Sequence, residues 1–259
     1  MRKYREAAQV SQRSLAARIG WCSGSWVSMV ETGHRRPTRE FAQAVDGILG
    51  LGSVLTDLYD EIENLPVPEW FRPWVEIEQD AMVLRTWQPL VVYGLLQTEA
   101  YAKALMSGEP GVTDHQLNQN VSARLERQQV LRRTPPVVVW VVLDEGVLTR
   151  CVGDPNVMAG QLQHLIEVAR QPHITLQVLP NASRVTTGLN GGFVIAEGQG
   201  AAMVGAWRES SGEGQLVDRA KGIRDLSYMY EVIRAEALAQ RASLRVIEEM
   251  RGRWLADQS

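Results

Sequence analysis

The sequence predicts an α+β protein in two parts: an all-α N-terminal domain, then a larger mixed α/β domain. Residues 1–62 have the pattern of short helices separated by tight turns. Three prolines within the eleven residues 64–74 are typical of a linker. Beyond them, apolar β-branched runs alternate with helical patterns. We therefore expect domains at 1–62 and 75–259, joined by a linker at 63–74.

Composition and charge restrict the possible functions. The chain has 259 residues, of which 45% are apolar, and a formal charge of −3. Residues 1–41 hold eight Arg/Lys and three Asp/Glu, a balance of +5, so the remainder carries −8. This distribution suits a small basic domain that contacts nucleic acid, attached to an acidic one. The longest apolar run, 137–143, is too short to cross a bilayer.

The two cysteines lie far apart and have no partner motif, so we expect neither a disulfide nor a cysteine metal site. The first residues lack the charged-then-apolar pattern of a signal segment, so we expect none. Both observations favour a protein of the reducing cytoplasm.

Cap residues mark the helices of the N-terminal part. Ser11 is placed to cap a helix that ends at Gly20, and Thr38 follows a proline and is placed to cap a third helix. A short helix between them ends at Gly33. We expect the segment 55–64 to add a further turn or two.

The first two of these helices carry the residues that a helix-turn-helix needs. It requires a small residue inside its first helix, a glycine in the turn and β-branched core residues in the second. These roles fall to Ala16, Gly20, Val27 and Val30. The second helix of such a unit lies in the major groove of DNA. The positions that would face the groove are Ser25, Ser28, Met29 and Thr32. None can make the bidentate contacts by which Arg reads guanine, so direct readout should be weak.

The pattern S-Q-x-x-L-A-x-x-I-G, followed by V-S-x-V-E-x-G-x-R-x-P, resembles the Xre/Cro-like helix-turn-helix family. The resemblance implies double-stranded DNA as a partner and a homodimer. It places Gln12 at a phosphate and the adjacent base edge, and Arg5 with Glu31 in a buried ion pair. It gives phosphate contacts, which position without selecting sequence, to Arg35, Arg36 and Arg39. We also expect Arg13 to contact the DNA.

The segment "WCSGSW" departs from that family. Gly20 and Glu31 are eleven positions apart, one more than is usual. Gly24 weakens the start of the second helix by roughly 1 kcal/mol relative to Ala. Trp26 either packs on the neighbouring helix or is exposed for a partner.

The C-terminal part reads as a small sheet with helices. We expect helices at 75–87, 95–106, 113–133 and 155–171, and two more between 218 and 255. A strand at 137–144, buried on both faces, and another at 173–180 enclose a helix and form a βαβ unit. Residues 191–207 read as a hairpin.

Residues 70–254 resemble an uncharacterised domain that follows Xre-type helix-turn-helix units in actinomycete regulators, many of them encoded beside a small partner protein. The segments L-L-Q-T and Q-L-x-x-L carry this resemblance. It implies a domain that binds a small-molecule effector or a small protein.

The sequence indicates ligand-binding residues less clearly than DNA-binding residues. Ligand pockets are apolar with a few polar groups. Residues that could line one are Trp87, Tyr93, Trp140, Trp207 and Arg208, although each also fits a core position. Glu145 follows a strand, where it either meets a ligand or caps the next helix. The histidines lack metal-ligand spacing, and the glycines of 188–192 lack the Lys-Ser/Thr of a phosphate loop. We therefore expect no metal, cofactor or catalytic residue.

Two functions of different class remain. The first is a DNA-binding transcriptional regulator with an effector-binding C-terminal domain. The alternative is a repurposed relative without sequence-specific DNA binding, whose C-terminal pocket binds or transforms a metabolite. A helical adaptor that only binds protein is a third interpretation.

Overall fold

The computed structural model describes residues 1–35, 37–63, 67–201, 203–210 and 214–257. The chain divides into two compact units, Met1–Leu65 and Pro66–Ser259. The first is helical and the second combines a mixed sheet with helices, which confirms the predicted fold class. None of the helices in these described ranges is long and apolar enough to cross a membrane.

The N-terminal unit is built from short capped helices around a small core. Its described elements are α1 (Arg2–Ala7), α2 (Gln12–Ile19), α3 (Gly24–Glu31), α4 (Arg39–Leu49) and α5 (Val54–Glu63). The side chains of Ser11 and Thr38 accept backbone N–H groups at the starts of α2 and α4, as predicted. Leu15, Val27 and Phe41 are buried at the centre.

Helix α5 lies where the sequence predicted a further turn or two. Its first turn is capped from α4, because the carboxylate of buried Asp46 accepts the N–H groups of Leu55 at 2.9 Å and Thr56 at 2.8 Å. This cap comes from another helix, so no local sequence signal marks it.

The C-terminal unit contains a six-stranded mixed sheet in the order β3-β2-β1-β4-β5-β6. Strands β1, β2 and β3 are parallel, whereas β4, β5 and β6 are joined by antiparallel pairing. The strands are β1 (Val83–Gln88), β2 (Val138–Asp144), β3 (Ile174–Leu179), β4 (Phe193–Glu197), β5 (Met203–Arg208) and β6 (Gln215–Val217). The predicted βαβ unit and hairpin are both present, and β6 is an additional strand.

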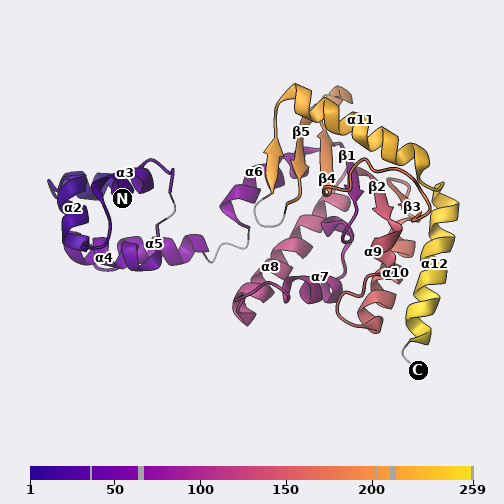
Figure 1. The fold of residues 1–259 in the computed structure, drawn as a ribbon, viewed down its shortest axis with the longest axis horizontal. Coiled ribbons are helices and arrows are strands. Elements are labelled where there is room, and N and C mark those ends of the chain that lie inside the picture. The colour runs from indigo at the N-terminus through magenta and orange to yellow at the C-terminus, as the bar shows by residue number, and fades with distance from the viewer. Residues whose placement is uncertain (36, 64–66, 202, 211–213, 258–259) are drawn as a thin grey trace. The chain divides into compact units, whose positions relative to one another are not determined.

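Helices cover both faces of this sheet (Figure 1). The longer ones are α6 (Arg72–Asp80), α7 (Glu99–Met106), α8 (Asp114–Arg127), α10 (Pro155–Val168), α11 (Ala220–Glu236) and α12 (Gln240–Ala256). Shorter ones are η1 (Glu69–Phe71), η2 (Gly94–Leu96), η3 (Gln128–Leu131), α9 (Glu145–Thr149) and η4 (Gln199–Ala201). Helix α11 packs on one face with Trp87 and Phe193. Leu84, Val194 and Trp207 pack on the other face with residues of α6, α10 and α12.

The prediction of one helix over 75–87 is wrong. Helix α6 ends at Asp80, Ala81 is extended, and residues 83–88 form β1 at the centre of the sheet. Arg85, Thr86 and Gln88 are buried within β1, so its sequence lacks both the alternation and the apolar run that usually reveal a strand. Pairing with β2 and β4 outweighed the local pattern.

Trp140 also differs from expectation. The strand at 137–144 was expected to be buried on both faces, yet Trp140 in β2 is 39% exposed. It points to the same face as Val142, two positions on. Val142 is buried in the cluster that includes α11, and Trp140 is not in that cluster. The face is therefore only partly covered.

Part of the expected linker belongs to the C-terminal unit. Residues 64–66 lie outside the described residues. Trp70 stacks on Trp207 with ring centroids 5.6 Å apart, and Trp74 is 1% exposed. Pro68 precedes the helical turn that begins at Glu69, and Pro73 lies in the first turn of α6, so both belong to helix starts.

Candidate functional site

Helices α2 and α3 form the helix-turn-helix pair of the N-terminal unit. Gly20 ends α2 in the left-handed conformation, with φ of 87°. The side chain of Ser23 accepts the N–H of Trp26 at 3.2 Å and caps α3. Val27 is fully buried, whereas Val30 is half-buried. The turn therefore leads into a well-capped α3 despite the additional residue.

Gly24 is the first residue of α3 and lies against α2. A Cβ atom on it would approach Arg13 Cα to 3.3 Å. The glycine that weakens the helix in isolation therefore allows the two backbones to approach closely. Sequence reasoning missed this role because it depends on contact between two helices.

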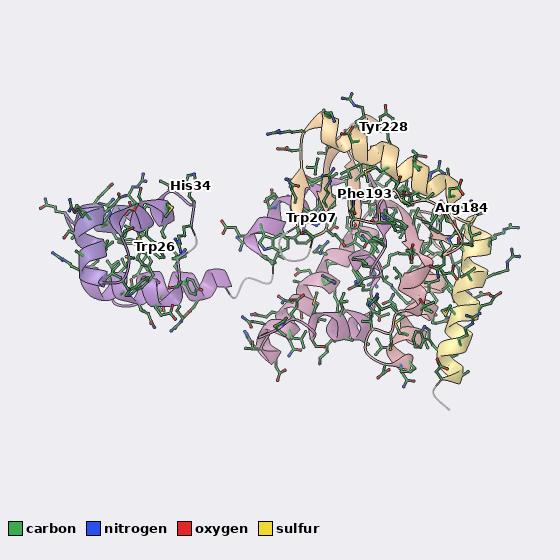
Figure 2. All side chains as sticks on the ribbon, in the orientation of Figure 1. Trp26, His34, Arg184, Phe193, Trp207 and Tyr228 are labelled. Atoms are coloured by element: carbon green, nitrogen blue, oxygen red, sulfur yellow. The ribbon has the colours of Figure 1, made fainter. Side chains whose placement is uncertain are left out.

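Trp26 packs inside the unit, where it joins an aromatic cluster (Figure 2). The ring centroids of Trp26 and Phe41 are 4.4 Å apart. Trp21, which is 55% exposed, contacts both rings edge-on. The guanidinium of Arg35 lies over Trp26, 5.3 Å from the ring centroid. This cation–π contact positions Arg35 beside the end of α3.

Arg5 and Glu31 form an ion pair between α1 and α3. Arg5 donates to both carboxylate oxygens of Glu31, at 2.7 and 2.9 Å. The amide of Gln12 donates to the same carboxylate at 2.7 Å. Desolvation raises the pKa of Glu31, but the hydrogen bonds from Arg5 and Gln12 outweigh it and the pKa lies below its ordinary value. Gln12, expected at a phosphate and a base edge, is thus held inside the protein.

The outward side of α3 presents few groups that can read bases. Ser25 is exposed and its hydroxyl lies 2.9 Å from that of Ser23. Met29 is 38% exposed, and Ser28 is half-buried. The hydroxyl of Thr32 donates to the Ser28 carbonyl at 2.8 Å. Ser25, Met29 and Thr32 are therefore the exposed positions of this side, whereas Ser28 is partly covered.

The basic residues around α3 differ in whether a carboxylate of the protein already binds them. The side chains of Arg13 and Arg35 are exposed and form no ion pair with a residue that the structure describes. Arg39 donates two 2.8 Å hydrogen bonds to Asp60. Arg36 lies outside the described residues.

The six residues expected to bind a ligand do not surround one space. Trp87 faces α11, and its indole N–H donates to the carbonyl of Gly188 at 2.9 Å. Tyr93 and Trp207 are buried on the opposite face (Figure 2 labels Trp207), whereas Arg208 and Trp140 are exposed. The sheet therefore lies between Trp87 on one side and Tyr93 and Trp207 on the other.

Glu145 lies at the carboxyl edge of the sheet but does not cap α9. That role belongs to Asp144, whose side chain accepts the N–H of Gly146 at 2.8 Å. Glu145 instead accepts the N–H of Asn181, just after β3, at 2.7 Å. Its carboxylate connects the ends of two parallel strands.

A buried polar network joins α6 and α8 on the side of the sheet where Tyr93 is found. Glu78 is 1% exposed and accepts two 2.9 Å hydrogen bonds from Arg127. It also accepts from the hydroxyl of Tyr93 at 3.2 Å. Desolvation and the Glu78 charge raise the pKa of Tyr93 well above its ordinary value. Tyr93 therefore acts here as a neutral hydrogen-bond donor.

Three further polar residues of this side were not singled out from the sequence: Gln88, Arg124 and Glu209. A signal for Arg124 was present, because Leu117, Val121 and Arg124 lie on one stripe of α8. A charged residue that continues an apolar stripe points inward. Gln88 gave no such signal, since the strand that carries it was not expected.

A groove of about 660 Å³ runs between α6 and the end of α8. Val75, Val130 and Arg127 are among its lining residues, and none of the six expected ligand residues is. Within the described ranges, no three His, Cys, Asp or Glu side chains gather as metal ligands would.

Comparison with known families gives two matches. Residues 1–58 match a family described as a helix-turn-helix domain. Residues 71–249 match the domain of unknown function DUF5753. No curated protein and no solved structure matched the chain. Since the second match spans well over half of the 259 residues, the chain belongs to the DUF5753 family and carries an N-terminal helix-turn-helix domain.

Proposed function

We propose that the protein is a cytoplasmic transcriptional regulator, an Xre/Cro-like protein of actinomycete type that binds double-stranded DNA as a homodimer. The helix-turn-helix match over residues 1–58 carries this proposal. The capped α2–α3 pair and the basic excess of the same unit support it. Helix α3 would enter the major groove, and two copies would bind half-sites about one helical turn apart.

The proposed interface relies on phosphate contacts more than on base contacts. Arg13, Arg35, Arg36 and Arg39 would neutralise phosphates, and Gln12 would contact one after leaving Glu31. Ser25, Ser28 and Thr32 can bond to several bases, and Met29 can touch a thymine methyl. Specificity would then depend largely on the shape and deformability of the DNA.

Gel retardation of the full-length protein tests this function. The DNA would be the region upstream of its own gene, compared with unrelated DNA of equal length, at several salt concentrations. Arg36→Ala or Arg39→Ala should weaken binding to both DNAs and reduce the salt slope by about one each. Arg241→Ala, at an exposed position of α12, is the matched control. Absence of retardation at low salt would refute the proposal.

We assign the effector function to the C-terminal unit, Pro66–Ser259. Binding of a small molecule or a small protein there would shift the dimer between forms that bind and do not bind DNA. Of the expected ligand residues, Tyr93 and Trp207 face the side of the sheet that holds the buried polar network. That side is where we place the effector.

A second function is favoured by one observation. Gln12 and Arg39, both proposed DNA contacts, are held by Glu31 and Asp60 within the unit. A repurposed relative would use the helix-turn-helix as a scaffold, and its C-terminal domain would bind or transform a metabolite. Ligand binding without any DNA retardation would distinguish it from a regulator.

A further inference from the structure

Gln88 at the end of β1 has a buried acceptor without a partner. The residue is 0% exposed. The hydroxyl of Thr86 donates to the Phe193 carbonyl at 3.0 Å, so it accepts from Gln88 Nε2 at 2.9 Å. Nε2 also donates to Glu209 Oε1 at 3.4 Å. These contacts set the orientation of the amide, and they leave Gln88 Oε1 without a hydrogen bond to any described residue.

Other oxygen atoms converge beside this acceptor around Gly192. A Cβ atom on Gly192 would lie 3.1 Å from Glu209 Oε2, 3.1 Å from the Trp87 carbonyl and 3.4 Å from Gln88 Oε1. A side chain here would press against all three. Because Gly192 has no Cβ, these three oxygen atoms can lie close together, and such a cluster of acceptors favours an N–H or ammonium donor.

These groups face the same side of the sheet as α8. Because strand side chains alternate, Gln88 shares a face with Leu84, and Glu209 follows the direction of Trp207. Leu84 and Trp207 both belong to the core opposite α11. The position is the carboxyl end of β1, which pairs parallel with β2 on one side and antiparallel with β4 on the other. Ligands of α/β sheets gather outside the carboxyl ends of strands.

Arg124 of α8 supplies an unneutralised cation on this side. Its Nη1 donates to the neutral amide of Gln97 at 2.8 Å, while its Nε is buried and has no partner among the described residues. Desolvation and then repulsion from Arg127 lower the pKa of Arg124 to about 10. Arg127 by contrast is neutralised by Glu78. A buried guanidinium in this state favours an anionic partner.

Arg124 and Glu209 are close enough for the charge of each to affect the pKa of the other. Desolvation nevertheless raises the pKa of Glu209, against the hydrogen bond from Gln88 and the charges of Arg124 and Arg127. As a residue Glu209 is exposed, so solvent reaches the rim of this region. The cation and the acid each lack a full partner.

We propose that Gln88, Glu209, Gly192 and Arg124 form a binding site for a small zwitterion of the amino-acid class. The ligand's ammonium group binds Gln88 Oε1 and Glu209, and its carboxylate binds Arg124. The site names the ligand class for the effector function proposed above and rests on that function. A ligand that lacks the ammonium group would leave Gln88 Oε1 and Glu209 without a donor, and one that lacks the carboxylate would leave Arg124 without an anion.

Calorimetry and thermal unfolding of the full-length protein with each common L-amino acid as the probe test this site. At least one amino acid should bind and raise the unfolding temperature. Its carboxamide and its N-acetyl derivative, which lack one charge each, should bind at least about tenfold more weakly. If no amino acid binds, or if both derivatives bind equally well, the proposal is wrong.

Variants locate the site. Arg124→Met and Gln88→Met should abolish binding, while Arg132→Met, at an exposed arginine just beyond η3, should not. Gly192→Ala removes no polar partner and should also weaken binding. It therefore tests the site independently if Arg124→Met or Gln88→Met fails to fold. Binding that survives Gly192→Ala and Arg124→Met would place the ligand elsewhere.

These measurements need no DNA, so the two proposals fail separately. Intact DNA retardation without amino-acid binding would overturn only the ligand site. Amino-acid binding without retardation would overturn only the regulator function.

Discussion

Arg39 at the start of α4 holds Asp60 of α5 through two parallel hydrogen bonds, both 2.8 Å long. The two side chains are 50% and 37% exposed. A guanidinium binds phosphate with the same fork of N–H groups that it offers a carboxylate. A phosphate would therefore have to displace Asp60 from Arg39.

Replacing Asp60 should strengthen DNA binding if Arg39 contacts a phosphate. Asp60→Asn frees Arg39 and removes a negative charge, so we expect about three- to tenfold tighter binding at low salt. Asp57→Asn is the control, since Asp57 lies in the same helix but bonds to Ser53. Equal effects of the two substitutions in a retardation titration would show that Arg39 is not a contact.

The Arg5–Glu31 pair should make the N-terminal unit sensitive to acid. The pKa of Glu31 is lowered from its ordinary value of 4.5. Its stabilisation is therefore complete above that value and is lost as the pH falls through the folded-state pKa. Glu31→Gln should reduce stability at neutral pH by on the order of 1–2 kcal/mol.

Hydrogen exchange at the amides of α2 and α3 measures this loss in the full-length protein. The wild-type protein should lose protection below pH 4.5, and the Glu31→Gln variant should show a flatter pH profile. Glu248→Gln, at an exposed residue of α12, is the control. A Glu31→Gln variant with an unchanged profile would mean that the ion pair contributes nothing.

Two glycines should respond in opposite ways to alanine. Gly47 in α4 has nothing within 4 Å of its Cβ position, so Gly47→Ala should stabilise the unit by about 0.5–1 kcal/mol. Gly24→Ala places a Cβ 3.3 Å from Arg13 Cα, and helix backbone cannot easily move. We expect destabilisation by about 1 kcal/mol. Thermal unfolding compares them, and stabilisation by both would refute the close approach of α2 and α3.

Trp26 and Trp21 should differ in their contribution to stability although both belong to the aromatic cluster. Trp26 is half-buried against Phe41, so Trp26→Ala should cost about 3 kcal/mol. Trp21 is 55% exposed, and Trp21→Ala should cost less than about 1 kcal/mol. Hydrogen exchange in α3 and α4 reports both. Equal losses would mean that the exposed indole also contributes to the core.

Sequence patterns predicted those features that depend on neighbouring residues along the chain. Ser11, Gly20 and Thr38 act within one helical turn, so their roles are visible in a single segment. The βαβ unit and the hairpin also follow from long, regular apolar runs. The cap that Asp46 provides to α5 joins two helices and could not be predicted in this way.

The same distinction between local patterns and long-range contacts applies to the residues of the candidate sites. Sequence alone indicated the outward positions of α3, because the periodicity of a helix relates them to the core residue Val27. Only the tertiary structure showed that Gln12 is held by Glu31 and that Gly24 allows α2 and α3 to approach. Both depend on contacts between separate helices.

For the C-terminal unit the sequence by itself determined the class of fold and most of its helices. The tertiary structure decided where β1 lies and which polar residues it buries. Gln88, Gly192 and Glu209 come from three separate segments that strand pairing brings together, and Arg124 belongs to helix α8, which lies elsewhere in the chain. Strand pairing and burial are long-range interactions, and they outweigh the local preferences by which a sequence is read.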